Sequence, residues 1–353
     1  MHQCPGQFRP FALRQWLHAE CRRRFPGGRG RTSPGRSVAV ARAQADAAGY
    51  EYLAALTSLR GEIARTYFSL LFADAEIDLL EKTAAFRKEA SRLMSVRNEA
   101  GDASRIDAQR AITEYESVRT ELARVRVRRG QLENALGTLT GTSASAFNLA
   151  SGRITFDLPV VPATVPGELL RRRPDIAAAE RRLAAASETI GLVIASYLPR
   201  IDLIGSGGLQ SVKASDLFDS NSRLWTLGPE MFVPLFQGGR LFADRDQAEA
   251  AYREALENYR DTVLRAVQET EDALIATRGL ASAARSATTG SDAARLAAKL
   301  TRSRYDGGIA SYFELVDAER TALAEERAEL AIALDRALAT ATLIQSLGGG
   351  WTR

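Results

Sequence analysis

Residues 101–107 read Gly-Asp-Ala-Ser-Arg-Ile-Asp, and residues 308–314 read Gly-Ile-Ala-Ser-Tyr-Phe-Glu. The two stretches align without a gap at an offset of 308 minus 101, or 207 residues. Each begins with a glycine that can take a positive φ where a long helical pattern ends. Each then has a serine, Ser104 or Ser311, where the next helix needs an N-cap, and an acid three residues later completes a capping box. Each stretch therefore predicts the tip of a helical hairpin.

The equal spacing of the two tips indicates an internal duplication, and Ala111 matches Ala318 at the same offset. The alternative is that any helical hairpin selects these residue types. Under the duplication, residues 37–157 form a first repeat and residues 158–353 a second one. The second repeat contains a pattern of alternating residues that the first one lacks, so we expect the first repeat to be without its strand pair.

Heptad patterns of apolar residues flank both predicted tips, as in a coiled coil. They predict helices over residues 37–99, 106–139 and 240–304, and a last helix after the second tip. The members before the first tip are Leu53, Leu56, Leu59, Ile63, Tyr67, Leu70, Ile77 and Leu80. Those after it are Tyr115, Val118, Leu122, Val125, Leu132, Leu136 and Leu139, with Arg129 in one core position. Those of the last helix are Val316, Leu323, Leu330, Ala337 and Ile344.

Residues 200–237 follow a period of two instead. Apolar residues and glycines alternate with other residues over 201–209, and apolar residues alternate again over 225–235. This pattern predicts a β-hairpin of two long strands joined by a polar link. A loop rich in Gly, Ser and Pro over residues 140–174 and a helix over 174–197 precede it. Since the chain offers few other strands, we expect the hairpin to pair with another copy or to remain an exposed edge.

Charge and composition exclude several classes of function. The chain has 353 residues and a formal net charge of +4, but residues 1–36 hold eight arginines and one acid, so the remainder is mildly acidic. This distribution argues against a nucleic-acid-binding surface. Cys and His occur only in residues 1–36, which excludes zinc sites and Cys- or His-based catalysis for the rest. We expect no cofactor and no transmembrane helix, because every window of about 18 residues contains charges.

Residues 1–36 form an atypical basic segment. Their Pro- and Gly-rich composition predicts an irregular or disordered stretch. One interpretation is a flexible basic tail, and the other is a wrong start or a frameshift, since the composition changes abruptly at Ser37. We expect no export signal in this segment, because it has no apolar core followed by a small-residue cleavage site. Neither Cys4 nor Cys21 follows such a core.

Residues 168–181 read Glu-Leu-Leu-Arg-Arg-Arg-Pro-Asp-Ile-Ala-Ala-Ala-Glu-Arg. They closely resemble the LLRRRPDIxxAE signature of the TolC-type outer-membrane efflux channels, in the OprM/NodT branch that serves resistance-nodulation-division pumps. Tyr-Leu-Pro-Arg-Ile at 197–201, Pro-Leu-Phe-Gln-Gly-Gly-Arg at 234–240 and Leu-Gly-Gly-Gly-Trp at 347–351 also fit this family. The resemblance covers residues 37–353.

The resemblance implies a mainly α fold, with long antiparallel coiled-coil hairpins of an α-barrel protomer and one β-hairpin contributing to a trimeric outer-membrane β-barrel. It implies a homotrimer that works without enzymatic chemistry as a passive conduit for drugs or other small molecules from periplasm to exterior. The implied partners are a periplasmic adaptor protein, an inner-membrane pump and outer-membrane lipid. Family members in this branch usually carry a lipid on an N-terminal cysteine, but we do not transfer this to Cys4 or Cys21.

The tips carry the first set of candidate site residues. In the family, the tips of the helical hairpins meet the hairpins of the adaptor. Plain helix capping explains the same residues, and the two interpretations are compatible. The candidate adaptor contacts are Gly101, Ala103, Ser104, Gly308, Ala310 and Ser311.

The resemblance also implies a periplasmic gate. Asp317 lies nine residues after its tip glycine, where three copies around an axis would form an acidic, cation-selective ring. Phe313, one turn earlier, would form an apolar ring. Asp107 and Tyr305 match positions that link neighbouring hairpins in the closed state of some relatives, although the arginine that would join them is Ala310 here.

Three other functions stay open at this point. The chain could be a structural coiled-coil protein without a transport role, in which case residues 200–237 would be dispensable. It could be the periplasmic adaptor, although two tips and a C-terminal helix argue against this. It could also be a truncated, non-transporting remnant of the family. The exported compound cannot be read from the sequence.

Overall fold

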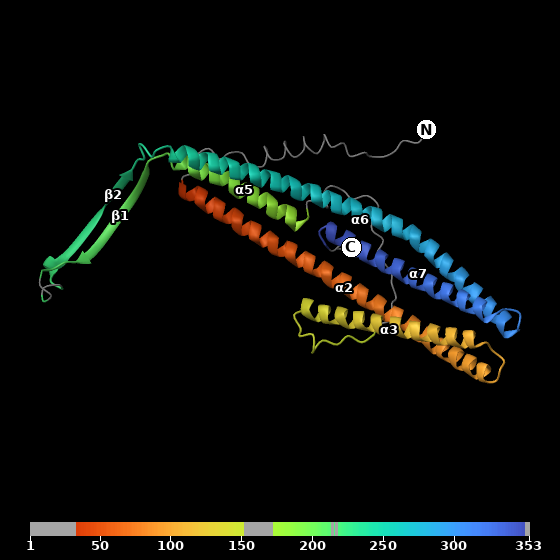
Figure 1. The fold of residues 1–353 in the computed structure, drawn as a ribbon. Coiled ribbons are helices and arrows are strands. Elements are labelled where there is room, and N and C mark those ends of the chain that lie inside the picture. The colour runs from red at the N-terminus through yellow and green to blue at the C-terminus, as the bar shows by residue number, and fades with distance from the viewer. Residues whose placement is uncertain (1–32, 152–171, 213–214, 216–217, 350–353) are drawn as a thin grey trace, which may run out of the picture. The chain divides into compact units, whose positions relative to one another are not determined.

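The computed structural model describes residues 33–151, 172–212, 215 and 218–349, and these residues are mainly helical (Figure 1). Long helical hairpins and one β-hairpin make up the fold, which confirms the predicted fold class. In chain order the elements are α2 (Ser33–Glu99), α3 (Arg105–Leu139), α5 (Pro174–Ala195), β1 (Arg200–Leu209), the 3₁₀ turn η2 (Ser220–Ser222), β2 (Arg223–Phe232), α6 (Arg240–Asp306) and α7 (Tyr312–Ser346).

Helix α2 begins earlier than the sequence pattern predicted. We expected residues 1–36 to be irregular, but the helix already starts at Ser33. Pro34 lies in its first turn, where proline is tolerated because the first N–H groups of a helix have no partner within it. The rest of that prediction, for residues 1–32, and the predicted loop over 152–171 lie outside the described residues.

The four long helices form two matching pairs. Helices α2 and α6 each span 67 residues, and helices α3 and α7 each span 35 residues. Every bound in the second pair lies 207 residues after its counterpart in the first, as 306 minus 99 and 346 minus 139 both show. The helix bounds therefore follow the spacing of the two tip sequences.

The chain divides into two compact units, and each unit is assembled from both halves of the sequence. The first unit comprises Met1–Tyr52 and Asp175–Val263, and the second comprises Leu53–Pro174 and Leu264–Arg353. Helices α2 and α6 each pass from one unit into the other. The compact units are thus different from the two predicted repeats, and the division into repeats stays a prediction.

The first unit contains an amphipathic β-hairpin. Strands β1 and β2 pair antiparallel from Arg200 opposite Phe232 to Leu209 opposite Arg223. Since side chains alternate across a strand, most of the large apolar residues lie on one face, and the other face carries Asp202 and Glu230 together with Ile204, Leu224 and Phe232. The apolar face consists of Ile201, Leu203 and Leu209 of β1 with Leu227, Trp225 and Met231 of β2. All six are exposed, for example Leu203 to 77% and Trp225 to 78%.

Strand β2 is shorter than the predicted run of alternating residues, which reached residue 235. It ends at Phe232, two residues before Pro234. Phe232 lies opposite Arg200, the first residue of β1, so β2 has no partner strand beyond it. Helix α5 likewise ends at Ala195, two residues before its predicted end.

The second unit has its main apolar core between α2 and α3. Leu80 and Ala73 of α2 pack with Val118, Leu122 and Val125 of α3, and Leu80 is only 1% exposed. These residues are members or neighbours of the predicted heptad patterns. The heptad pattern places Arg129 in a core position, and there its charge is paired with two acids. Its Nε donates to Asp74 at 2.9 Å and its Nη1 donates to Glu133 at 2.5 Å.

Part of the predicted seam is uncovered in the single chain. Leu53, Leu59 and Tyr67 are 45%, 40% and 41% exposed. The heptad pattern identifies which residues avoid water, but a helix with apolar residues on two sides needs a neighbour on each side. The prediction that these three residues belong to a buried seam is therefore wrong for one chain alone.

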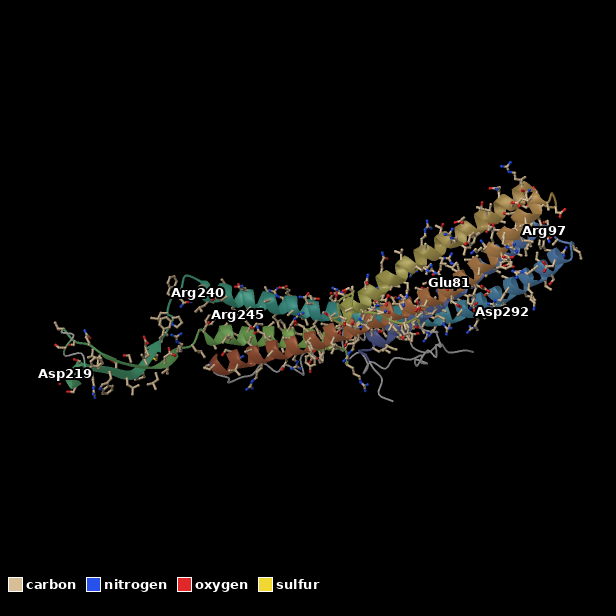
Figure 2. All side chains as sticks on the ribbon, turned by 90° about the horizontal axis from the view of Figure 1, so that it is seen from below. Glu81, Arg97, Asp219, Arg240, Arg245 and Asp292 are labelled. Carbon is tan, nitrogen blue, oxygen red and sulfur yellow. The ribbon has the colours of Figure 1, made fainter. Side chains whose placement is uncertain are left out.

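Charged side chains project from the helices along their length, for example Glu81, Arg97 and Asp292 (Figure 2). Many pair across the surface, as Arg126 does with Glu81 at 2.7 Å. Each such exposed pair contributes only about 0–1 kcal/mol. Among the described residues, no helix combines the length and the apolar character needed to cross a bilayer.

The core between α2 and α3 gives a stability prediction. We expect Leu80→Ala to lower the free energy of unfolding by about 2–5 kcal/mol, because it removes a fully buried side chain and leaves a cavity. Ile275→Ala is the matched control, since this side chain on α6 is 67% exposed. Urea unfolding followed by circular dichroism measures both. Equal losses in the two variants would contradict the assignment of Leu80 to the core.

Candidate functional site at the helix tips

The two tips have the same backbone hydrogen bonds. At the first, the N–H of Asp102 donates to the carbonyl of Arg97 at 2.8 Å, and the N–H of Gly101 donates to Asn98 at 3.1 Å. At the second, Ile309 donates to Arg304 at 2.8 Å in the same way. This pair of bonds is the Schellman motif, which needs a left-handed residue. The φ angles of the tip glycines, +84° and +73°, agree with the prediction.

The serine caps differ in detail between the tips. Ser311 Oγ accepts a hydrogen bond from the N–H of Glu314 at 3.2 Å and lies 3.2 Å from the Glu314 carboxylate. Ser104 Oγ instead accepts from the N–H of Ile106 at 3.1 Å. The predicted capping box between Ser104 and Asp107 is therefore wrong in this detail, because the side chain of Ser104 turns to the donor one position earlier.

The predicted adaptor-contacting residues differ in how much surface they offer. Gly101, Ser104, Gly308 and Ser311 are exposed. Ala103 is half-buried and Ala310 is buried, at 9% exposure. Ala310 therefore presents little of its side chain to a partner, whereas the other five leave atoms open at the tips.

The second tip is tied to the first hairpin by an arginine that the sequence did not point to. Arg97 in the last turn of α2 donates from Nη1 to the hydroxyl oxygen of Tyr305 at 3.2 Å. From the resemblance, we expected the arginine of this link at position 310 in the second hairpin, where this chain has Ala310. Instead, the structure brings an arginine to Tyr305 from the first hairpin. From the sequence, Arg97 could be recognised as a basic residue that favours a helix C-terminus, but its partner Tyr305 could not be identified.

Tyr305 also packs against the ring of Tyr312, with ring centroids 6.0 Å apart. Burial, together with the nearby Tyr305, Glu114 and Asp107, raises the pKa of Tyr312 to about 12, so its hydroxyl stays neutral at physiological pH. Asp107 is half-buried in the first turn of α3. The hydrogen bond at Tyr305 comes from Arg97, and Asp107 acts on this cluster through its charge.

Phe313 and Asp317 lie one turn apart on α7, and both are exposed, Phe313 to 58%. The guanidinium of Arg110 on α3 sits 5.2 Å from the centre of the Phe313 ring, within cation–π range. Asp317 is close enough to Arg320 for its charge to add to the effect of Glu114, which holds the pKa of that arginine above its usual value. The predicted apolar and acidic positions therefore each have an arginine beside them.

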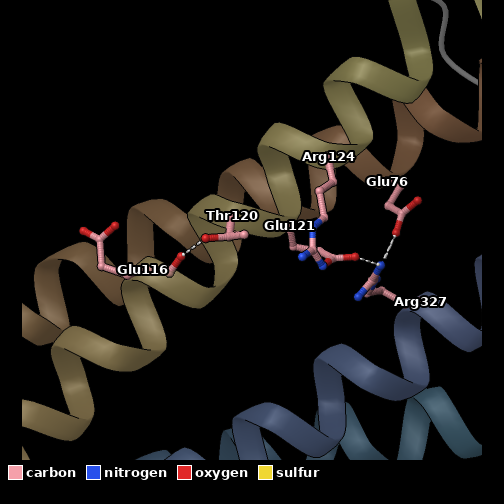
Figure 3. Close-up of polar contacts among 6 residues, drawn as sticks. All are labelled: Glu76, Glu116, Thr120, Glu121, Arg124 and Arg327. Atoms are coloured by element: carbon pink, nitrogen blue, oxygen red, sulfur yellow. Dashed lines mark hydrogen bonds and ion pairs between the residues drawn. The ribbon is translucent and has the colours of Figure 1, made fainter. Parts of the chain in front are cut away.

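A charged network joins the two hairpins farther from the tips. Arg327 of α7 donates from Nη2 to Glu76 of α2 at 2.6 Å and to Glu121 of α3 at 2.7 Å (Figure 3). One heptad nearer the tip, Arg320 of α7 pairs with Glu114 of α3.

Glu114 is the buried centre of this network. Its side chain is 8% exposed, and it also accepts from Nη1 of Arg87 at 2.6 Å. Burial lowers the pKa of Arg87, and the charge of Glu114 opposes that effect. Sequence reasoning missed this network. The only sequence pattern that pointed to it was the spacing of seven residues between Glu114 and Glu121 and between Arg320 and Arg327.

The described residues contain no group of three or more His, Cys, Asp or Glu side chains that could hold a metal ion. The tips offer hydrogen-bonding backbone, the aromatic rings of Tyr305, Tyr312 and Phe313, and charges of both signs. This arrangement can line an opening or bind another helix, and nothing in it requires a reacting atom.

Comparison with known proteins identifies the family. The model of the outer membrane efflux protein family matches residues 35–142 and 165–349. Outer membrane protein OprJ of Pseudomonas aeruginosa is 34% identical over 315 residues, which are 87% of this chain and 66% of that protein. The solvent efflux pump outer membrane protein SrpC of Pseudomonas putida is 32% identical over 84% of this chain and 63% of its own length. The chain thus spans a little under two thirds of these relatives.

Solved structures agree in fold. A crystal structure of a membrane protein from Pseudomonas aeruginosa superposes with a TM-score of 0.80 at 33% identity, covering 89% of this chain and 72% of that one. These matches include both hairpins and the β-hairpin segment, and they confirm the resemblance drawn from residues 168–181. The chain belongs to the outer membrane efflux protein family.

Proposed function

We propose that this protein is the outer-membrane channel component of a tripartite efflux system, a passive conduit for drugs or other small molecules. The observation that carries the proposal is the match of the efflux family model to both helical hairpins, whose tips have the same geometry. The relatives named above are efflux-pump or outer-membrane proteins, and the family has no enzymatic activity. The compound that is exported is chosen by the pump.

The β-hairpin supports a location in the outer membrane. Its apolar face, with Leu203, Trp225 and Leu227 among its members, is exposed, and its other face carries Asp202 and Glu230. A barrel wall needs one lipid-facing and one lumen-facing side in each strand. Two strands are too few for a barrel, so the proposal includes several copies of the chain, as a homotrimer, with their strands combined.

The tips support the proposed partners. The exposed Gly101, Ser104, Gly308 and Ser311 are positioned to receive the helical hairpin of a periplasmic adaptor, which would connect the channel to an inner-membrane pump. The same end holds Asp317 and Phe313, and Tyr305 is linked to Arg97. We assign the periplasmic gate to this group, with Asp107 acting on it through its charge.

The first prediction concerns Asp317. In planar bilayers, we expect the full chain to give channels with a preference for cations, and Asp317→Asn to reduce that preference, because each copy loses one negative charge at the opening. Asp335→Asn is the control, since it makes the same change on the exposed part of α7 far from the tip. Reversal potentials in a salt gradient measure both. An unchanged selectivity of Asp317→Asn would remove Asp317 from the gate.

The second prediction concerns the link between Arg97 and Tyr305. Tyr305→Phe removes the hydroxyl that accepts the hydrogen bond but keeps the ring against Tyr312. We expect the channels to open more often, by a factor of about 2 to 10, because an exposed hydrogen bond of this kind contributes about 0.5–1.5 kcal/mol. Tyr312→Phe is the matched control. If single-channel records of the two variants agree with each other, the link does not hold the gate closed.

A further inference from the structure

Two of the stretches that carry the family resemblance meet at the end of α7, and the proposed function gives neither of them a role. They are residues 168–181 and residues 347–351, of which 347–349 are described. Arg173 of the first stretch is buried, and its Nη1 donates to the backbone carbonyl of Ser346 at 3.1 Å. Its Nη2 donates to Glu269 of α6 at 2.7 Å. One arginine therefore joins the segment before α5 to both α6 and α7.

The bond from Arg173 completes the hydrogen bonding at the end of α7. The last four carbonyls of a helix have no partner within it. The N–H groups of residues 347–349 donate, at 3.0–3.1 Å, to the carbonyls of Leu343, Ile344 and Gln345. The fourth carbonyl, that of Ser346, is buried and accepts from Arg173. A positive charge at this place is also favourable toward the helix dipole. Arg173 thus acts as a side-chain cap on α7.

Gly348 lies directly against the backbone of the arginine segment. Its φ is +90°, and a Cβ at this position would lie 3.3 Å from the carbonyl of Arg172. Gly141, its counterpart at the 207-residue offset, has a φ of +76° and ends α3 with the same backbone bonds. No described atom lies within 4 Å of a Cβ built on Gly141. Gly348 is therefore needed for the close approach as well as for its positive φ.

The first hairpin and α6 contribute the remaining contacts. The side-chain oxygen of Gln345 accepts from Nη1 of Arg65 on α2 at 2.7 Å. A Cβ at Gly61 would overlap this oxygen, so glycine leaves room for the Gln345 side chain. Leu343 and Leu347 are buried and pack against two residues of α6. The end of α7 thus contacts α2, α6 and residues 172–173.

We propose that Arg173 and the turn at Gly348 form a clasp that holds the end of α7 in place, with Arg173 as its positioning residue. The apolar contacts of Leu343 and Leu347 are non-directional, so they tolerate a shift of the helix end along α6. The donors of a guanidinium lie in one plane and in fixed directions, so Arg173 fits one placement of Ser346 relative to Glu269. The clasp therefore fixes α7 at the end that lies opposite its tip.

The test follows local opening of this helix end in the full chain with Cys4→Ser and Cys21→Ser. Ser346→Cys places a single thiol at a position that is 4% exposed, and it keeps the backbone carbonyl. We expect a maleimide to label it slowly, and about ten- to hundredfold faster once Arg173→Ala is added, because the helix end loses its charged donor. Arg173→Lys should give an intermediate rate, since the ammonium keeps the charge but not the planar pair of donors.

Ala339→Cys is the matched control, because it lies on the same helix, seven residues nearer the tip, and is 9% exposed. Its labelling should stay slow when Arg173→Ala is added, since only the end of α7 opens. Equal acceleration at both positions would mean that Arg173 stabilises the chain as a whole, which would overturn the clasp. Unchanged labelling of Ser346→Cys would overturn it as well.

A second pair of variants tests the close approach at Gly348. Asparagine also takes a positive φ, so Gly348→Asn keeps the turn but places a Cβ against the backbone of Arg172. We expect the labelling of Ser346→Cys to rise about fivefold or more, and the urea midpoint to fall, because the helix end must move away. Gly141→Asn, at the open turn of α3, should change neither quantity. Equal behaviour of the two variants would contradict the clasp. Labelling and unfolding need no channel activity, so a failure here leaves the channel proposal untouched.

Discussion

The carboxylate of Glu114 is the constraint on which the arrangement of the two hairpins depends. It is buried between Arg87 of its own hairpin and Arg320 of the other, and removal of either arginine would leave it incompletely paired. A buried charge network adds little net stability compared with an apolar core, but an unpaired member costs several kcal/mol. Any slip of α7 along α3 separates these charges, so the network fixes their relative register more firmly than apolar contacts could.

The Schellman turns at the two tips determine where α3 and α7 begin, and therefore how these helices are aligned. Both hairpins reverse direction at a left-handed glycine, Gly101 or Gly308, followed by a serine cap three residues later. Since α3 and α7 begin the same number of residues after these turns, Glu114, 13 residues after Gly101, and Arg320, 12 residues after Gly308, lie at nearly the same height above the tips. A longer turn in either hairpin would move one row of charges past the other. Local backbone chemistry at the tips thus decides which side chains can pair.

The sequence predicted the elements well because their causes are local. Heptad spacing, tip glycines and alternation each depend on residues that are neighbours along the chain, and they located the long helices and the β-hairpin within a few residues. The errors were of the same local kind, such as the start of α2 at Ser33 and the end of β2 before Pro234. Periodicity could not tell that Leu53 and Leu59 remain exposed, because exposure depends on what lies beside the helix.

The contacts between hairpins were beyond sequence reasoning for a physical reason. Arg97 and Tyr305 are 208 residues apart, and a single arginine at a helix end has many possible acceptors until the packing selects one. The same holds for Arg327, which pairs with acids on two different helices. The candidate gate positions Phe313 and Asp317 could be placed on a helix face from their spacing alone. The arginines beside them, Arg110 and Arg320, required the pairing of α3 with α7.

The pairing of the β-hairpin with other strands also depends on how the helices pack. Two antiparallel strands with an exposed apolar face are marginally stable in water and leave both outer edges unpaired. Strands of other copies can complete them only if the copies are held at a common height and spacing. Under the function proposed above, helices whose turns and charges fix their register provide such a scaffold, and the alternation in β1 and β2 then decides which side faces lipid. Strand pairing between copies would in that case be a consequence of helix packing.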